Sequence, residues 1–252
     1  MKIALTRRIS PSIIHCELTH LERQPIDYPN ALRQHAAYEA CLEALGCRVQ
    51  QLPGDPGMPD CVFIEDTALV LDEVAVITRP GAESRRSETA AVADALAAYR
   101  SLYFIEPPGT LDGGDILRLG KSLYVGISGR SNVEGIRQLS SLLGLSGYTV
   151  QGVPLSDCLH LKSAVTQVAG DTLLVNPRWV APAVFGAWQL VEVDPQEPYA
   201  ANALLLGEAV VYPSAYTRTA ARLERLGLSL HRVDVSELAK AEGGVTCCSL
   251  IL

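Results

Sequence analysis

The sequence predicts an α/β protein in which one strand–turn–strand–helix unit is repeated around a ring. Four stretches follow this order, with lead positions 49, 48 and 39 residues apart. These lead positions are Asp66, Asp115, Ser163 and Asn202. Spacing of this size is typical of repeat architectures. A fifth unit is divided between the two ends of the chain, and pairing the last strand with the first would close the ring.

Each of the four undivided units begins with a predicted hairpin whose turn contains a glycine or an acidic residue. The hairpins are expected at 65–80, 114–128, 162–178 and 201–219. Helices are expected after three of them, at 87–99, 131–144 and 220–227. The third unit has a weak helix or none.

The fifth unit joins a C-terminal strand at 248–252 to a second strand at 3–8. Its helix is expected at 30–46, with Asn30 at the N-cap and Gly46 just past the end. Small and apolar residues within this helix can pack against a sheet. Closure of this unit would bring the lead residues of all units close to one central axis.

The composition favours a globular protein, and we expect a single domain spanning residues 1–252. With 48% hydrophobic residues the chain can bury a large core. The net charge of −7 argues against a nucleic-acid-binding surface. No segment resembles a membrane span or a signal peptide, so we expect a cytoplasmic protein without a membrane partner. The seven cysteines are odd in number and form no Cys-x-x-Cys pair, which disfavours a disulfide framework and a structural zinc site.

The C-terminal segment GGVTCCSLIL contains a candidate nucleophile. Strand alternation would direct one of Cys247 and Cys248 into the core and the other out of it. A cysteine can act as a nucleophile when a histidine and carboxylates are close to it. The expected ring places such residues at or near the lead positions of their units. They are Glu65, Asp66, Asp112, Asp115 and His160. Each alone has an ordinary explanation in turn chemistry or core packing, but their equivalent positions favour a common site.

Seven segments between residues 59 and 249 carry a more specific pattern. In chain order they read PDCVFIEDTALV, ITRPGAESRRSE, PGTLDGGDIL, YVGISGRSN, LHLKSAV, YAAN and GGVTCCS. These segments resemble the dimethylarginine dimethylaminohydrolases, or dimethylargininases, of the pentein superfamily of guanidino-modifying enzymes. The resemblance implies a five-bladed α/β propeller of ββαβ repeats, closed by pairing of the N- and C-terminal strands. That fold agrees with the five units counted above.

The resemblance also implies a hydrolase and a set of residue roles. The reaction would convert Nω-methylated and Nω,Nω-dimethylated L-arginine to L-citrulline plus methylamine or dimethylamine, through a covalent cysteine thiouronium intermediate. The implied catalytic residues are Cys247 as nucleophile, His160 as general acid and base, and Asp112. The implied substrate-binding residues are Leu18, Asp60, Glu65, Asp66, Arg85, Arg130 and Ala241. Cys248 is outside the pattern, and some members carry Glu where this chain has Asp112.

Elementary chemistry fits these implied roles. A guanidinium is planar and cationic, so Asp66 and Asp112 can accept its N–H groups. The resemblance assigns the α-carboxylate of a free amino acid to Arg85 and Arg130, whose guanidinium forks suit it. It also implies that Leu18 lies in a mobile loop above the site and that the carbonyl oxygen of residue 241 faces the α-amino group.

Other interpretations stay open at this point. An arginine or agmatine deiminase, or an amidinotransferase, would use the same cysteine, histidine and acids. Arg85 and Arg130 disfavour agmatine, which has no carboxylate. A non-catalytic ring that binds arginine-like ligands would leave Cys247 inert. We expect a small-molecule substrate, no metal or organic cofactor and no nucleic-acid partner, and the sequence leaves open whether the protein forms a homodimer.

Overall fold

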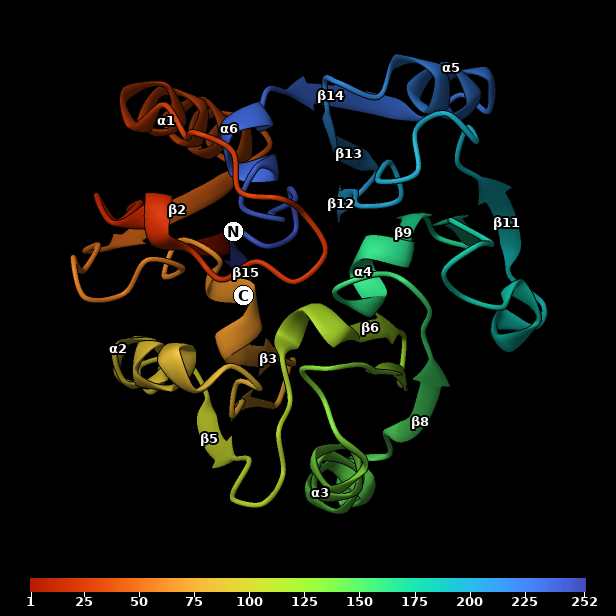
Figure 1. Cartoon of the computed structure of the whole chain (residues 1–252). Coiled ribbons are helices and arrows are strands. Elements are labelled where there is room, and N and C mark those ends of the chain that lie inside the picture. Colours follow the sequence, from red (N-terminus) through yellow and green to blue (C-terminus); the bar gives the residue numbers. More distant parts are fainter.

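Five three-stranded sheets surround a common centre in the computed structural model, which describes residues 1–252 (Figure 1). Each sheet has an inner strand, a middle strand antiparallel to it and an outer strand parallel to the middle one. The sheets are separate from one another and do not form one continuous closed sheet. The expected five-bladed α/β propeller is therefore confirmed, with each sheet as one blade.

Four blades are formed by consecutive stretches of the chain. The first contains β3 (Ala68–Val70), β4 (Val74–Ile77) and β5 (Ser101–Phe104). The second contains β6 (Ile116–Leu119), β7 (Ser122–Ile127) and β8 (Thr149–Pro154). The third contains β9 (Val165–Ala169), β10 (Thr172–Val175) and β11 (Gln189–Glu192). The fourth contains β12 (Leu204–Leu206), β13 (Ala209–Pro213) and β14 (Ser229–Val233). Every hairpin lies within its predicted range.

The two ends of the chain complete the fifth blade. β15 (Leu250–Ile251) pairs antiparallel with β1 (Lys2–Arg7), which pairs in parallel with β2 (Cys47–Leu52). Leu5 is paired with Leu250 across this junction, and both are buried. The closure predicted from the sequence is confirmed.

Helices lie on the outside of the ring (Figure 1). In four blades a helix connects the middle strand to the outer strand along the chain. They are α1 (Tyr28–Ala44), α2 (Thr89–Leu96), α3 (Val133–Leu143) and α5 (Thr217–Arg225). The third blade has a 3-10 turn, Pro182–Phe185, in place of a helix, as the sequence indicated. Two single-turn helices are α4 (Leu161–Ala164) and α6 (Ser236–Ala239).

The beginning of α1 differs from the prediction. Asp27, and not Asn30, is the N-cap residue, because its side chain accepts a hydrogen bond from the backbone N–H of Asn30 (3.0 Å). Pro29 occupies the first turn, where no backbone N–H is needed. Gly46 follows the helix end as predicted, with a φ of +86° that glycine adopts without strain.

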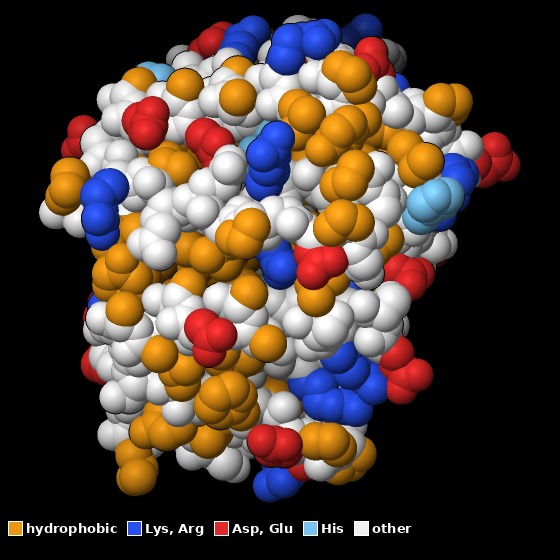
Figure 2. All heavy atoms as spheres, turned by 90° about the vertical axis from the view of Figure 1, so that its left-hand side faces the viewer, with side chains coloured by type: hydrophobic (Ala, Val, Ile, Leu, Met, Phe, Trp, Pro, Cys, Tyr) orange, Lys and Arg blue, Asp and Glu red, His pale blue; other side chains and the backbone are white.

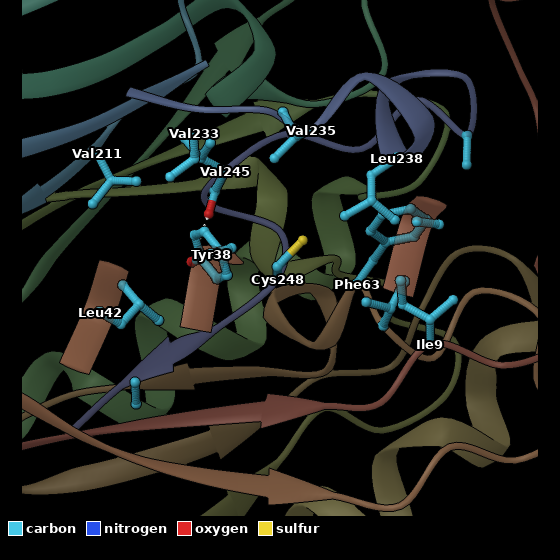
Figure 3. Packing of buried hydrophobic residues seen from close by; sticks show 14 of the residues in the cluster. Ile9, Tyr38, Leu42, Phe63, Val211, Val233, Val235, Leu238, Val245 and Cys248 are labelled. Atoms are coloured by element: carbon cyan, nitrogen blue, oxygen red, sulfur yellow. Dashed lines mark hydrogen bonds between the residues drawn. The ribbon is translucent and has the colours of Figure 1, made fainter. Parts of the chain in front are cut away.

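Apolar side chains pack in five clusters distributed around the ring. The largest, with 18 buried residues, surrounds Tyr38 of α1 and includes Val245 and Cys248 (Figure 3). Tyr38 is fully buried. Its hydroxyl donates to the carbonyl oxygen of Val245 (2.8 Å) and lies 2.7 Å from the Ser249 hydroxyl. Helix α1 thus holds the segment before β15 in place from outside the ring.

Side chains of both charge signs are interspersed with hydrophobic ones on the face shown in Figure 2. None of the helices combines the length and the apolar character that a membrane crossing requires.

Candidate active site

Loops from several blades meet around a small cavity of about 20 Å³. Its lining includes Asp66, Arg85, Arg130, His160, Ala241 and Cys247. A neighbouring cavity of about 200 Å³ shares Cys247 but is lined by neither arginine. The charged groups that could bind an amino acid therefore surround the smaller cavity.

His160 lies between two buried carboxylates. Its Nε2 atom is 3.1 Å from Oδ2 of Asp112, and its Nδ1 atom is 3.8 Å from Oδ1 of Asp66. The other oxygen of Asp112 accepts a hydrogen bond from the backbone N–H of Gly81 (2.9 Å). Burial by itself would lower the pKa of the imidazole, but the charge of Asp66 and the hydrogen bond to Asp112 outweigh burial and raise this pKa to about 9. His160 is therefore protonated at neutral pH.

Asp66 is held in place by a buried arginine. Its Oδ2 atom accepts a hydrogen bond from Nη1 of Arg85 (2.6 Å), and its Oδ1 atom accepts one from the backbone N–H of Gly114 (3.0 Å). Burial would raise the pKa of Asp66, but the positive charges of His160 and Arg85 outweigh it and lower this pKa to about 2. Asp66 stays ionised and can accept N–H groups of a bound cation.

Arg85 is more enclosed than a substrate-binding arginine needs to be. Nε and Nη2 donate to Glu88 (3.2 and 2.9 Å), and Nη2 also donates to the carbonyl oxygen of Phe63 (3.0 Å). Together with the bond to Asp66, these contacts engage four of its five N–H groups. Arg85 thus orients Asp66, and one Nη1 hydrogen remains for the substrate contact that the sequence predicts.

The Asp-Gly-Gly-Asp motif at 112–115 allows the first two blades and the loop that carries His160 to approach closely. A Cβ atom on Gly113 would collide with the backbone oxygen of Glu65. A Cβ atom on Gly114 would lie 2.6 Å from Nδ1 of His160. Any larger residue at these two positions would push the carboxylates and the imidazole apart, so the glycines are a steric requirement of the site.

Cys247 lies in a turn before β15, so the strand predicted from residue 248 onward is shorter than expected. The backbone N–H of Cys247 donates to the carbonyl oxygen of Gly244 (3.2 Å), and the N–H of Gly244 points at Sγ of Cys247 (3.3 Å). These contacts hold residues 244–247 in a turn instead of the sheet. Cys247 is half-buried and borders the cavity, whereas Cys248 is fully buried. The two side chains therefore face opposite ways, as predicted, although the backbone is a turn.

Burial raises the pKa of the Cys247 thiol to about 12, and the carboxylates of Glu65 and Asp66 act in the same direction. The thiol is therefore neutral in the free protein. A cation bound beside Cys247 would oppose both effects and favour the thiolate.

Glu65 does not line the small cavity, although the sequence predicts a substrate contact for it. Its Oε1 pairs with Nζ of Lys162 (2.5 Å), and its Oε2 accepts a hydrogen bond from the hydroxyl of Thr246 (2.7 Å). Asn202 donates to the same hydroxyl (2.9 Å) and accepts from the backbone N–H of Thr246 (3.1 Å). These groups hold the residue that precedes Cys247. Lys162 and Thr246 lie within the LHLKSAV and GGVTCCS segments, but the sequence pattern assigns no role to either.

A loop at residues 16–21, which we call the lid, is bonded to both sides of the cavity. The backbone N–H of Glu17 donates to the carboxylate of Asp60 (3.1 Å). The carboxylate of Glu242 accepts from three consecutive backbone N–H groups, at residues 19, 20 and 21 (3.0, 2.5 and 2.7 Å). Consecutive N–H groups of this kind form an anion-binding nest. The sequence does not point to Glu242, because a carboxylate partner for backbone groups more than 200 residues away carries no local signal.

The remaining predicted residues lie around the lid. Leu18 is half-buried against the apolar cluster around Tyr38 and does not line the small cavity. Arg130 is half-buried, and its Nη2 donates to the Thr19 hydroxyl (3.1 Å), which leaves its other N–H groups for a carboxylate. Ala241 borders the cavity. Free space of about 20 Å³ holds roughly one water, so the cavity in this conformation is too small for an amino acid.

The side chains of Asp66, Asp112 and His160 offer ligand atoms within 4.8 Å of one another. A metal ion requires a deprotonated imidazole nitrogen, whereas His160 has a pKa of about 9 and keeps its proton at neutral pH. A metal ion at this cluster would have to displace that proton, whereas proton transfer uses it as it stands.

Comparison with known proteins places the chain in a family. No family model matches it. A dimethylarginine dimethylaminohydrolase of Streptomyces coelicolor is 42% identical over 253 residues, which cover 100% of this chain and 97% of the relative. The structure of a mutant dimethylarginine dimethylaminohydrolase of Pseudomonas aeruginosa in complex with citrulline is similar with a TM-score of 0.95 and 36% identity, over 99% of this chain and 98% of that one. The N-terminal domain of a cyanobacterial arginine dihydrolase shares the fold, with a TM-score of 0.86 and 18% identity, over 100% and 98% of the two chains. This chain therefore belongs to the dimethylarginine dimethylaminohydrolase family of the pentein superfamily.

Proposed function

We propose that this protein hydrolyses Nω-methylated and Nω,Nω-dimethylated L-arginine to L-citrulline plus methylamine or dimethylamine. One observation carries the proposal. A single cavity is lined by a cysteine, a protonated histidine, an ionised aspartate and two arginines, in a chain of this family. This combination suits a substrate that has a cationic guanidinium at one end and a carboxylate at the other.

The two ends of the substrate have separate partners in this proposal. Arg130 and the free Nη1 hydrogen of Arg85 bind the α-carboxylate. Asp60 and the carbonyl oxygen of Ala241 face the α-amino group. Asp66 accepts N–H groups of the guanidinium and directs its central carbon toward Sγ of Cys247.

Binding of the substrate supplies the charge that activates the nucleophile. Two unit charges 4 Å apart interact by about 4 kcal/mol at an effective dielectric constant of 20, which corresponds to about three pKa units. A guanidinium at that distance from Sγ would lower the pKa of Cys247 from about 12 to about 9. The thiolate then becomes accessible near neutral pH only when the substrate is present, which protects the free protein from unwanted thiol chemistry.

The reaction proceeds in two halves. When the substrate binds, the Cys247 thiol releases its proton to water. The thiolate then attacks the guanidinium carbon and forms a tetrahedral adduct. Protonated His160 gives its proton to the methylated nitrogen, the C–N bond breaks, and the amine leaves behind a cysteine thiouronium. His160, now neutral, takes a proton from water, the hydroxide adds to the same carbon, and the C–S bond breaks to release citrulline. Asp112 keeps the imidazole oriented through both halves.

Release of the ureido product tests the proposal, citrulline from the three arginines and carbamoylputrescine from agmatine. The purified protein would be incubated separately with dimethylarginine, monomethylarginine, arginine and agmatine, with Cys247→Ser as the blank. We expect turnover of the two methylated arginines and none by the variant, with binding of methylarginine retained by the variant in calorimetry.

The other outcomes are informative. Turnover of arginine with none of the methylated substrates would replace the proposal with a deiminase. Turnover that persists in Cys247→Ser would reject the covalent mechanism. No ureido product from any of the four substrates, citrulline from the three arginines or carbamoylputrescine from agmatine, would reject hydrolysis of guanidino compounds as the function.

A further inference from the structure

Asp115 is a buried carboxylate to which the proposed mechanism gives no role. It is completely inaccessible to solvent. Its Oδ1 atom accepts a hydrogen bond from the backbone N–H of Leu161 (3.0 Å). Its Oδ2 atom accepts from the hydroxyls of Ser128 and Ser131 (both 2.6 Å). Three donors from two loops therefore converge on one side chain that makes no bond to a basic group.

The contact with Leu161 determines how His160 can be used. His160 occupies the N-cap position of α4, where a side chain normally bends back to accept a backbone N–H of the helix. The His160 side chain makes no such bond and reaches into the cavity instead. Asp115 accepts the first N–H group of α4 from the neighbouring blade, and the imidazole is left free for the reaction.

The two serines extend the same support to other site residues. The hydroxyl oxygen of Ser131, which donates to Asp115, also accepts a hydrogen bond from the backbone N–H of Asp112 (3.0 Å). The hydroxyl oxygen of Ser128 accepts from the backbone N–H groups of Arg130 (3.0 Å) and Ser131 (3.1 Å), but makes no bond to Asp112. Asp115 is thus bonded directly to the backbone beside His160 and, through one serine hydroxyl each, to the backbones of Asp112 and Arg130.

The surroundings of Asp115 are shaped to hold the side chain in one place. A Cβ atom on Gly126 would lie 2.5 Å from Oδ1 of Asp115, so the space for the carboxylate exists only because residue 126 is glycine. Burial raises the pKa of Asp115 to about 6, against the opposing charge of His160 and the two serine hydroxyls.

We propose that Asp115 is a positioning residue that fixes His160, Asp112 and Arg130 relative to one another. The proposal rests on the proposed function, in which His160 and Asp112 act in the chemical step and Arg130 binds the substrate carboxylate. The two serines divide this role. Ser131 supports the pair that transfers protons, whereas Ser128 supports the arginine that binds substrate.

This division predicts that two variants of the same type change different kinetic constants, one kcat and the other KM. In Ser131→Ala we expect kcat to fall about tenfold, the factor that one lost hydrogen bond gives, with KM within twofold of the wild type. In Ser128→Ala we expect KM to rise about tenfold with kcat within twofold. Ser141→Ala, an exposed position on α3, is the matched control and should change neither.

Substitution of Asp115 itself tests the centre of the network. Asp115→Asn keeps an acceptor for Leu161 but presents an NH2 group to the serine hydroxyls, so both kcat and KM should worsen. Asp115→Ala should lose more of both. Melting temperatures would be recorded for every variant, and kinetics measured well below them, so that unfolded protein does not contribute.

A purely structural role would give a different result. If Asp115→Asn and both serine variants melt earlier but keep kcat and KM within twofold, Asp115 only stabilises the fold and the proposal is overturned. The same holds if the two serine variants change kcat and KM in the same ratio. The rate of Cys247 alkylation by a haloacetamidine, which requires no turnover, separates this failure from failure of the proposed function. If the wild type releases no citrulline, a slower alkylation in Ser131→Ala than in Ser141→Ala still supports positioning, and equal rates reject it.

Discussion

Replacement of Asp112 by Asn should weaken the preference of His160 for its protonated form with almost no change in shape. Oδ1 of Asp112 accepts the backbone N–H of Gly81 (2.9 Å), so the amide oxygen of Asn would keep that position. The NH2 group would then face Nε2 of His160, where Oδ2 now lies at 3.1 Å. An NH2 group can donate only to an unprotonated Nε2, so the variant stabilises the neutral imidazole relative to the wild type.

The structure gives the size of this effect. The pKa of His160 is about 9, against an ordinary value of 6.5. The difference of about 2.5 units corresponds to about 3 kcal/mol in favour of the protonated form, at roughly 1.4 kcal/mol per unit. Asp66 is the largest cause that raises this pKa, and the hydrogen bond of Asp112 is the next. Asp112→Asn should therefore lower the pKa of His160 by at least about one unit while the effect of Asp66 remains.

The same shift appears in the free energy of unfolding. The folded pKa of His160 lies above the unfolded one, so its stabilisation is complete below pH 6.5 and is lost as the pH rises from 6.5 through about 9. The low pKa of Asp66, about 2, reports the same ion pair and adds no second contribution in this pH range. The wild type should lose up to about 3 kcal/mol over that interval through this group, and Asp112→Asn should lose less.

Two measurements check this prediction. Titration of the imidazole C2 protons by NMR resolves the five histidines, and the signal absent from His160→Gln identifies His160. Denaturant unfolding at pH 6 and pH 9 gives the change in stability. Asp171→Asn, in an exposed turn of the third blade, is the charge-matched control. A wild-type His160 that titrates near 6.5, or one whose pKa is the same in Asp112→Asn, would refute the reasoning.

Three further predictions concern the supports of the site. Tyr38→Phe removes the donor to the buried carbonyl of Val245. It should lower the free energy of unfolding by about 1–2 kcal/mol, or the melting temperature by about 2–8 °C. An unchanged calorimetric transition would contradict this prediction. Glu242→Gln cannot accept three N–H groups of the lid, so we expect KM for dimethylarginine to rise about tenfold with little change in kcat. The exposed Glu22→Gln is its control, and equal KM values in the two variants would show that the lid bonds are irrelevant to binding. Gly114→Ala places a methyl group 2.6 Å from the imidazole Nδ1 and should reduce kcat by on the order of 100-fold or more, because a displacement of about 1 Å has that effect. Gly170→Ala is the control and should be neutral, because its added methyl group meets no atom within 4 Å. An active Gly114→Ala variant would show that the site can expand.

Much of the fold could be predicted because it is written in local patterns. Hairpin turns, alternating strands and helix periodicity each depend on a few neighbouring residues, and the four hairpins lie within their predicted ranges. Errors occurred where two local solutions compete. Asp27 and Asn30 can both cap a helix, and only the packing of α1 against the fifth blade decides between them. The strand at 248 was shortened for a similar reason, since the glycines at 243 and 244 let the chain turn before it enters the sheet.

The candidate site divides in the same way. The chemical types of Cys247, His160, Asp112 and Asp66 follow from the sequence, because motif and repeat position identify them before any coordinates are known. The direction in which a long side chain points does not follow, because it depends on which partners packing brings within reach. Glu65 could have faced the cavity, but Lys162 of another blade holds it elsewhere.

The sequence by itself determined that five units close into a ring and that the cysteine, histidine and acids lie at its centre. Only the tertiary structure decided how each charge is compensated. Arg85 orients Asp66, and Glu242 holds the backbone of the lid. Asp115 supports the loop that carries His160. These contacts join residues from 19 to 223 positions apart in the chain. Buried charges are stable only where such partners satisfy them, and that condition is met by the assembled blades and not by any single segment.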